Sequence, residues 1–92
     1  MNNFYLRFNP LIWENGDLSI EKKLIINFVW NFCIKSGYAY SSNDYIAQVF
    51  GMRVTDVKTL IAELLEEEHI KTIPHPERRL LIVNTKLYPI EE

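Results

Sequence analysis

The sequence of 92 residues is long enough for one small domain, and it carries a single cysteine, Cys33. One cysteine excludes an internal disulfide framework and suits a reducing compartment. The most apolar stretch, 24–34, is too short to cross a bilayer and is interrupted by Asn27 and Asn31. No basic segment followed by an apolar run opens the chain, so no secretory signal is expected. We therefore expect a soluble, cytoplasmic, single-domain globular protein that does not contact a membrane.

The net charge of −2 is low for a protein that binds nucleic acid, but the charges are unevenly distributed. Segments 53–58 and 71–79 hold five Lys or Arg residues against two acidic ones, a net charge of +3. The remainder therefore carries −5, much of it in the glutamates of 66–68 and 91–92. Such polarity is able to orient a small domain on a polyanion.

Residues 1–18 are expected to form an N-terminal arm with one helical turn, because Asn9 is a good N-cap and Pro10 suits the first helical position. The first long helix is predicted over residues 19–37, capped by Ser19 and ended by a glycine. Its apolar side chains recur at helical spacing and extend around more than one face. We expect this helix to be buried on more than one side, or to pack against the arm or a second subunit.

Two further helices are predicted on either side of Gly51. The segment 38–40 contains two tyrosines and is bounded by glycine and serine, which favours a minimal strand before the first of these two helices. A serine then caps a helix over residues 42–51, and a third helix covers 53–68. Gly51 supplies the positive φ that a tight turn between them requires. The third helix has an apolar stripe with steps of three and four residues: Val54, Val57, Leu60, Ile61, Leu64 and Leu65.

A β-hairpin is predicted over residues 70–83, because β-prone segments at 70–73 and 79–83 flank a proline-rich turn. The tail that follows, residues 84–92, contains Pro89 and two terminal glutamates. We expect this tail to fray.

The order helix, short strand, helix, turn, helix, hairpin is that of a winged helix-turn-helix domain, an α+β and mainly α fold whose hairpin is called the wing. More narrowly, the chain resembles the N-terminal domains of plasmid and phage replication initiators from low-GC bacteria. The resemblance covers roughly residues 17–83, and the family usually has Ser or Thr at Arg53 and Gly at His69. The matching segments are 17–19 with 23–24, 40–42, 46–52, and 57 with 61–66 and Ile70.

This resemblance implies non-catalytic binding of double-stranded DNA, in replication initiation or transcription control of a phage or plasmid. If the helix over 53–68 enters the major groove, its exposed N-terminal residues reach base edges and its lysine reaches the backbone. The first residues of the preceding helix are expected to bind phosphate with their free N–H groups, and the basic wing residues to grip flanking phosphates. The expected DNA-binding residues are Ser42, Asn43, Arg53, Thr55, Lys58, Thr59, Lys71, Arg78 and Arg79.

Adjacent side chains alternate between the two faces of a strand, and this limits how many of the two wing arginines contact DNA. If Arg78 and Arg79 both lie within a strand, they point to opposite faces, and at most one of them reaches DNA. The competing interpretation of all these residues is a solvated surface, in which the charges of the hairpin prevent edge-to-edge pairing.

The rival hypothesis for function is a winged helix repurposed as a protein-interaction module, favoured by the acidic net charge, Asp56 and the aromatic arm. A third is a small metal or redox protein, since Glu66 and His69 form a Glu-x-x-His step. Such centres need two copies of that step, and no zinc-ligand spacing is present. No phosphate-binding loop or nucleophile motif occurs, so we expect no enzyme and no cofactor.

The expected partners are double-stranded DNA and a replication or transcription protein. A homodimer through the N-terminal arm and first helix is also expected, because aromatic residues are concentrated there and winged-helix dimers read paired half-sites.

Overall fold

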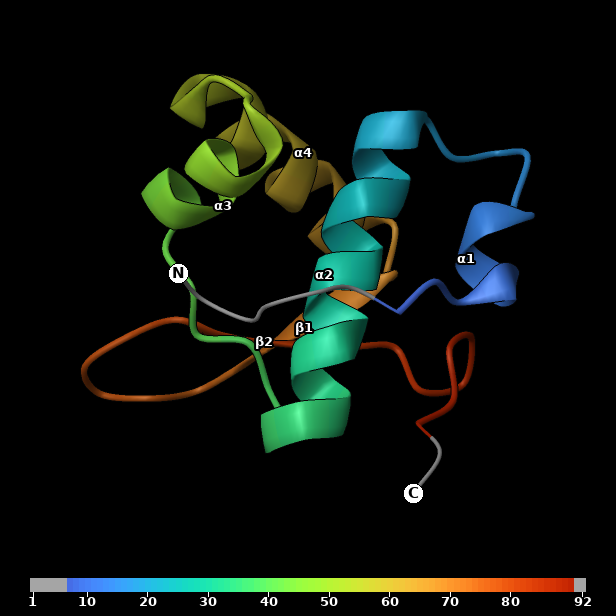
Figure 1. Ribbon diagram of the computed structural model, residues 1–92. Helices are drawn as coiled ribbons and strands as arrows, with labels where there is room; N and C mark the ends of the chain where they lie inside the picture. Colours follow the sequence, from blue (N-terminus) through green and yellow to red (C-terminus); the bar gives the residue numbers. More distant parts are fainter. Residues whose placement is uncertain (1–6, 91–92) are drawn as a thin grey trace.

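The computed structural model describes residues 7–90, which form four helices and one two-stranded antiparallel sheet (Figure 1). The fold is therefore α+β and mainly helical. Within the described range, no helix has the length and apolar character needed to pass through a lipid bilayer. The elements are α1 (Pro10–Trp13), α2 (Ile20–Ser36), α3 (Asn43–Phe50), α4 (Val54–Glu66), β1 (Ile70–Ile73) and β2 (Leu80–Val83).

The boundaries of α2 and α3 follow local capping signals. The Oγ atoms of Ser19 and Ser42 accept hydrogen bonds from backbone N–H groups in the first turns of α2 and α3. Both helices end at a glycine in the left-handed region, and Gly51 has a φ of 66°. The predicted ranges 19–37 and 42–51 are thus these two helices together with their caps.

A three-residue turn, 51–53, leads from α3 into α4. The N–H of Met52 donates to the carbonyl of Ala47 at 2.9 Å and closes the turn. Arg53 is the N-cap residue of α4, but its side chain forms no capping hydrogen bond. The predicted helix over 53–68 is longer than α4, because Glu68 adopts a φ of 65° and turns the chain toward β1.

The two strands form a hairpin in which Ile70 pairs with Val83 and Ile73 with Leu80. The minimal strand predicted at 38–40 is reduced to one residue, Ala39. Its N–H and C=O exchange 2.8 Å hydrogen bonds with those of Leu81 in β2. The linker between α2 and α3, residues 37–42, is therefore attached to the hairpin.

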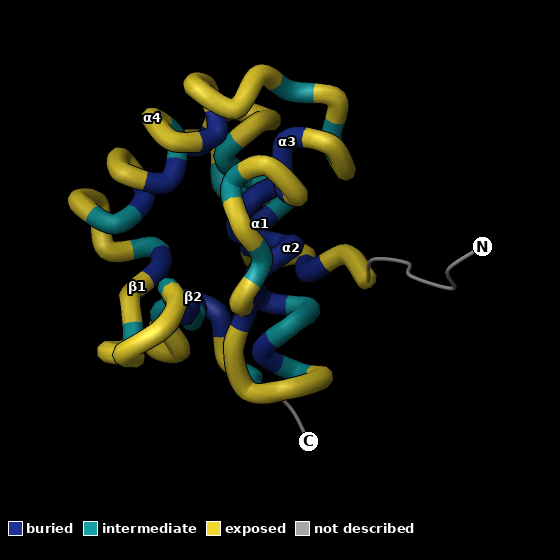
Figure 2. Tube along the Cα trace, turned by 90° about the vertical axis from the view of Figure 1, so that its left-hand side faces the viewer, coloured by how far each residue is buried: buried dark blue, intermediate teal, exposed yellow. Residues whose placement is uncertain are grey.

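Helix α2 is the centre of the core. Six consecutive residues, Ile25–Trp30, are buried, so the helix is covered on more than one side, as predicted. It contacts α1, α4 and β2, and the buried segments gather near it in Figure 2. Cys33 is also buried there, and desolvation raises the pKa of its thiol.

Two asparagines of α2 anchor the described part of the arm. Asn27 is fully buried; its Oδ1 accepts from the N–H of Asn9 at 3.1 Å, and its Nδ2 donates to the carbonyl of Arg7 at 2.7 Å. One turn later, Asn31 accepts from the N–H of Arg7 and donates to its carbonyl, both at 2.9 Å. The arm is thus held to α2 by backbone groups. The rest of the predicted arm, residues 1–6, lies outside the described residues.

The expectation that the tail frays is wrong for residues 84–90. Tyr88 is only 2% exposed, and its hydroxyl lies 2.8 Å from Nδ1 of His69. Trp30 Nε1 donates to the carbonyl of Pro89 at 3.2 Å, and Ile90 packs against the core. The free energy gained by burying an aromatic ring and an isoleucine outweighs the conformational entropy that the tail loses when it is ordered. The last two residues of the predicted tail lie outside the described range.

Replacing the buried amide of α2 should destabilise the protein. Asn27→Ala leaves the buried N–H of Asn9 without its acceptor, at a cost of about 1–3 kcal/mol in the free energy of unfolding. Urea unfolding followed by circular dichroism measures this. Asn31→Ala is the control and should cost less than about 1 kcal/mol, because water reaches the groups that it leaves. Equal costs for the two variants would contradict the assignment.

Candidate functional site

The first half of α4 presents a polar, exposed face. Val57, Ile61 and Leu64 are the buried residues of this helix, and its outward side is exposed in Figure 2. Thr55 and Lys58 lie on that exposed side. Thr59 is exposed as well, and its Oγ1 donates to the carbonyl of Thr55 at 3.1 Å. Three of the predicted DNA-binding residues are thus accessible to a partner.

Arg53 is accessible but paired. Its Nε lies 3.2 Å from Oδ2 of Asp56, and the two side chains are 84% and 52% exposed. An exposed pair of this kind contributes little to stability. It nevertheless neutralises the one guanidinium at the start of α4, and the i,i+3 spacing that creates it was visible in the sequence.

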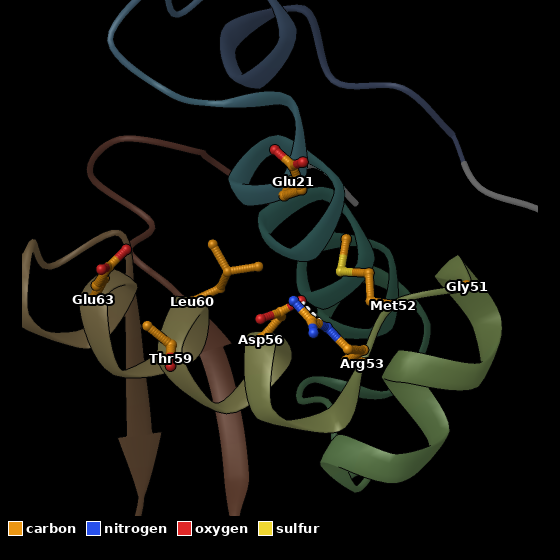
Figure 3. A pocket seen from close by; sticks show the side chains of 8 residues that line it. All are labelled: Glu21, Gly51, Met52, Arg53, Asp56, Thr59, Leu60 and Glu63. Carbon is orange, nitrogen blue, oxygen red and sulfur yellow. Dashed lines mark hydrogen bonds and ion pairs between the residues drawn. The ribbon is translucent and has the colours of Figure 1, made fainter.

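One flank of α4 carries a pocket of about 520 Å³ between this helix and the start of α2 (Figure 3). We call it the acidic pocket: the carboxylates of Glu21, Asp56 and Glu63 surround it, and Met52 and Leu60 supply apolar surface. Arg53 and Thr59 also line it. The three carboxylates of this lining outnumber its one guanidinium, and nothing in the sequence associates Glu21 with the site.

Lys22 fixes the start of α2 to the last turn of α4. Its ammonium lies 3.3 Å from Glu63 and 2.9 Å from Glu67. Hydrogen bonding to Glu67 is the main reason why the pKa of Lys22 is raised. Lys22 therefore links α2 to α4 at the C-terminal end of α4, where these glutamates lie.

A second pocket lies between the hairpin loop and the linker that precedes α3, two segments that run side by side in Figure 1. We call it the arginine pocket. It has a volume of about 300 Å³ and is lined by Tyr40, Ser41, Ser42, Asn43, Arg78 and Arg79. Four of the predicted DNA-binding residues meet here, at the N-terminus of an eight-residue helix.

Arg79 joins the two segments that line this pocket. Its guanidinium donates from Nη1 to Oδ1 of Asn43 and from Nη2 to the carbonyl of Ser41 at 2.6 Å. Desolvation lowers the pKa of Arg79, and no carboxylate oxygen of residues 7–90 lies within 4 Å of it. Its Nε is buried without a hydrogen-bond partner among those residues. A half-buried positive charge with only neutral partners is therefore built into the pocket.

Arg78 lies on the exposed side of the same pocket. Its guanidinium carbon is 5.4 Å from the ring centroid of Tyr40, a cation–π arrangement. Both arginines precede β2, which begins at Leu80. The alternation of side chains along a strand therefore does not force them to opposite faces, and both remain candidates for DNA contact. Lys71 lies apart from both pockets, exposed in β1 opposite Ile82.

Sequence reasoning missed Tyr40 and Ser41 as site residues. Tyr40 is separated from Arg78 by more than a third of the chain, and its aromatic character suggested only a short strand. No local spacing signal links these residues, since the pairing of Ala39 with Leu81 brings the two segments together.

Within residues 7–90, no three His, Cys, Asp or Glu side chains are grouped in a way that would hold a metal ion. No protein-family model, curated protein or solved structure matches this chain. Geometry and charge are therefore the basis for assigning a function.

The structural role of Arg79 gives a stability prediction. Arg79→Met retains most of the apolar stem but removes two charge-assisted hydrogen bonds between the hairpin and the start of α3. It should lower the free energy of unfolding by about 1.5–3 kcal/mol in urea titrations. Lys71→Met, an exposed substitution on the same hairpin, should stay within about 0.5 kcal/mol. If the two variants unfold alike, Arg79 does not hold the pocket together.

Proposed function

We propose that this protein is a winged-helix module that binds double-stranded DNA without catalysis, with α4 as the recognition helix and the β1–β2 hairpin as the wing. One observation carries the proposal: the exposed polar half of α4 lies on the same fold as two arginines that meet no carboxylate within residues 7–90. A helix face for base edges and a cationic site for phosphates are the two parts that duplex recognition requires.

In this proposal, Thr55, Lys58 and Thr59 enter the major groove. Arg53 exchanges its bond to Asp56 for a phosphate or a guanine edge, which an exposed ion pair permits at small cost. Lys71 of the wing lies against the flanking backbone.

The arginine pocket takes a phosphate of the same duplex. Ser42 and Asn43 contribute the N-terminal end of α3, where backbone N–H groups and the helix dipole favour an anion. Arg78 and Arg79 supply the positive charge. Because Arg79 is already bonded to Asn43, this site is preorganised and loses little side-chain entropy on binding.

The resemblance to replication initiators supports a role in replication initiation or in transcription control, in a plasmid or phage. A homodimer through the N-terminal arm and α2, the first predicted helix, is part of the proposal. It is supported by two apolar side chains at this end of the molecule, Phe8 and Leu11, which are 66% and 56% exposed.

A second candidate function is binding of a protein rather than DNA. The acidic pocket favours it, because three carboxylates around Met52 and Leu60 suit the aliphatic stem and charged head of a lysine or arginine from a partner. In that case α4 would present its acidic flank, and duplex DNA would not bind.

Binding to duplex DNA should depend on salt and on Lys58. In fluorescence anisotropy with a labelled duplex, log Kd should rise linearly with log salt concentration. Lys58→Ala should weaken binding and reduce the slope by about 1, the loss of one phosphate contact. Lys86→Ala removes an exposed lysine of the C-terminal segment and serves as the control. Duplex affinity that ignores salt and Lys58 would favour the protein-partner function.

Removing the negative charge at the start of α4 should strengthen duplex binding. Asp56→Asn releases Arg53 and removes a carboxylate that repels phosphate. The same change weakens the interaction with the helix dipole, so the free energy of unfolding should fall by about 0.3–1 kcal/mol. Anisotropy and urea unfolding on one preparation measure both effects. Weaker or unchanged duplex binding by Asp56→Asn would place the DNA away from the start of α4.

A further inference from the structure

We propose that Tyr40 and Arg78 form a stacking platform for an unpaired nucleotide, so that the arginine pocket also binds single-stranded nucleic acid. The inference goes beyond duplex binding, since it assigns the pocket a ligand that α4 does not recognise. It rests on an exposed aromatic ring, a guanidinium stacked on it and a cationic helix N-terminus, all in one pocket.

The ring of Tyr40 is both fixed and accessible. Edge-on contacts with Phe32 and Tyr38, at centroid distances of 6.4 and 6.3 Å, hold it in place. It is nevertheless 51% exposed, although Arg78 lies over it. A flat base is therefore able to stack on the ring or on the planar guanidinium, the two surfaces that single-strand binders use.

The positive charge beside the ring favours a nucleotide over an uncharged aromatic ligand. Arg79 is half-buried with neutral hydrogen-bond partners, and Arg78 is exposed with no carboxylate within 4 Å among residues 7–90. Both adjoin the N-terminal end of α3. A base on Tyr40 would place its own phosphate within this cationic region, so one nucleotide satisfies both features of the pocket.

Base pairing decides which nucleic acid the platform accepts. In a duplex, the faces of the bases are covered by their neighbours in the stack, and only their edges are accessible in the grooves. A ring-face platform is therefore useless for an intact duplex but suits an unpaired strand.

The experiment compares two labelled ten-nucleotide strands by fluorescence anisotropy, oligothymidine and an abasic strand with the same phosphates. The wild-type protein should bind oligothymidine at least about fivefold more tightly, because stacking of one base on an aromatic ring contributes about that much or more. Tyr40→Leu should abolish this difference and leave the abasic affinity unchanged. Tyr40→Phe, which retains the ring, should keep it, and Arg78→Ala should weaken binding to both strands.

The matched control is Tyr45→Leu, which removes another partly exposed tyrosine, one that does not line the pocket. It should keep the preference for oligothymidine, and circular dichroism melting shows that each variant is folded. Equal binding of the two strands by the wild type, or a preference that survives Tyr40→Leu, would overturn the proposal. These outcomes are independent of duplex binding, because loss of duplex affinity in Lys58→Ala leaves the Tyr40 comparison unaffected.

Discussion

The guanidinium of Arg79 joins the two segments from which the arginine pocket is built. It reaches from the hairpin loop to Asn43 and Ser41, so that one group sets the position of the loop relative to the start of α3. Withdrawing a cation from water costs free energy, and neutral acceptors offset that cost only in part. Because no carboxylate of residues 7–90 pairs with this half-buried charge, an anion in the pocket would compensate it.

The bond from Arg79 is supported by a second attachment of the same linker. Ala39 exchanges two backbone hydrogen bonds with Leu81, which lies two residues after Arg79 in the sequence. Because β2 in turn packs on α2, the pocket is tied to the most deeply buried element of the molecule. At the opposite end, Lys22 ties α2 to the last turn of α4. The two candidate surfaces are thus held on a common framework rather than on free loops.

Much of the helical framework was predictable because its signals are local. Ser19 and Ser42 cap the helices they precede, and Gly51 ends α3 where the sequence indicated a turn. The packing of the tail was not predictable, because burial of Tyr88 depends on space that other elements leave. Asn27 is instructive: in the sequence it only interrupts an apolar run, yet its amide is what the backbone of the arm requires.

Four residues of the arginine pocket were predicted from the sequence, but Tyr40, Ser41 and the grouping of all six were not. The basic positions of the hairpin were evident from composition, whereas their partners on the linker lie more than thirty residues away. Tyr40 joins them only through the pairing of Ala39, which no periodicity in the sequence indicates. By contrast, the pairing of Arg53 with Asp56 follows from helical spacing alone. Because this pair neutralises the guanidinium at the start of α4, the arginine pocket becomes the stronger candidate for binding an anion.

The acidic pocket and the arginine pocket have opposite electrostatic character, and this difference bears on how the chain would approach a polyanion. Glu21, Asp56 and Glu63 lie on the flank of α4 toward α2. Arg78 and Arg79, which meet no carboxylate within residues 7–90, belong to the hairpin loop and lie beside the start of α3. Carboxylates outnumber cations on the first side and arginines prevail on the second, so a phosphate backbone is favoured on the second. A net charge of −2 is therefore compatible with nucleic-acid binding, because charge placement, not the total, sets the local potential. These charges would then favour one orientation, in which the arginine pocket meets the strand and the acidic last turn of α4 faces away.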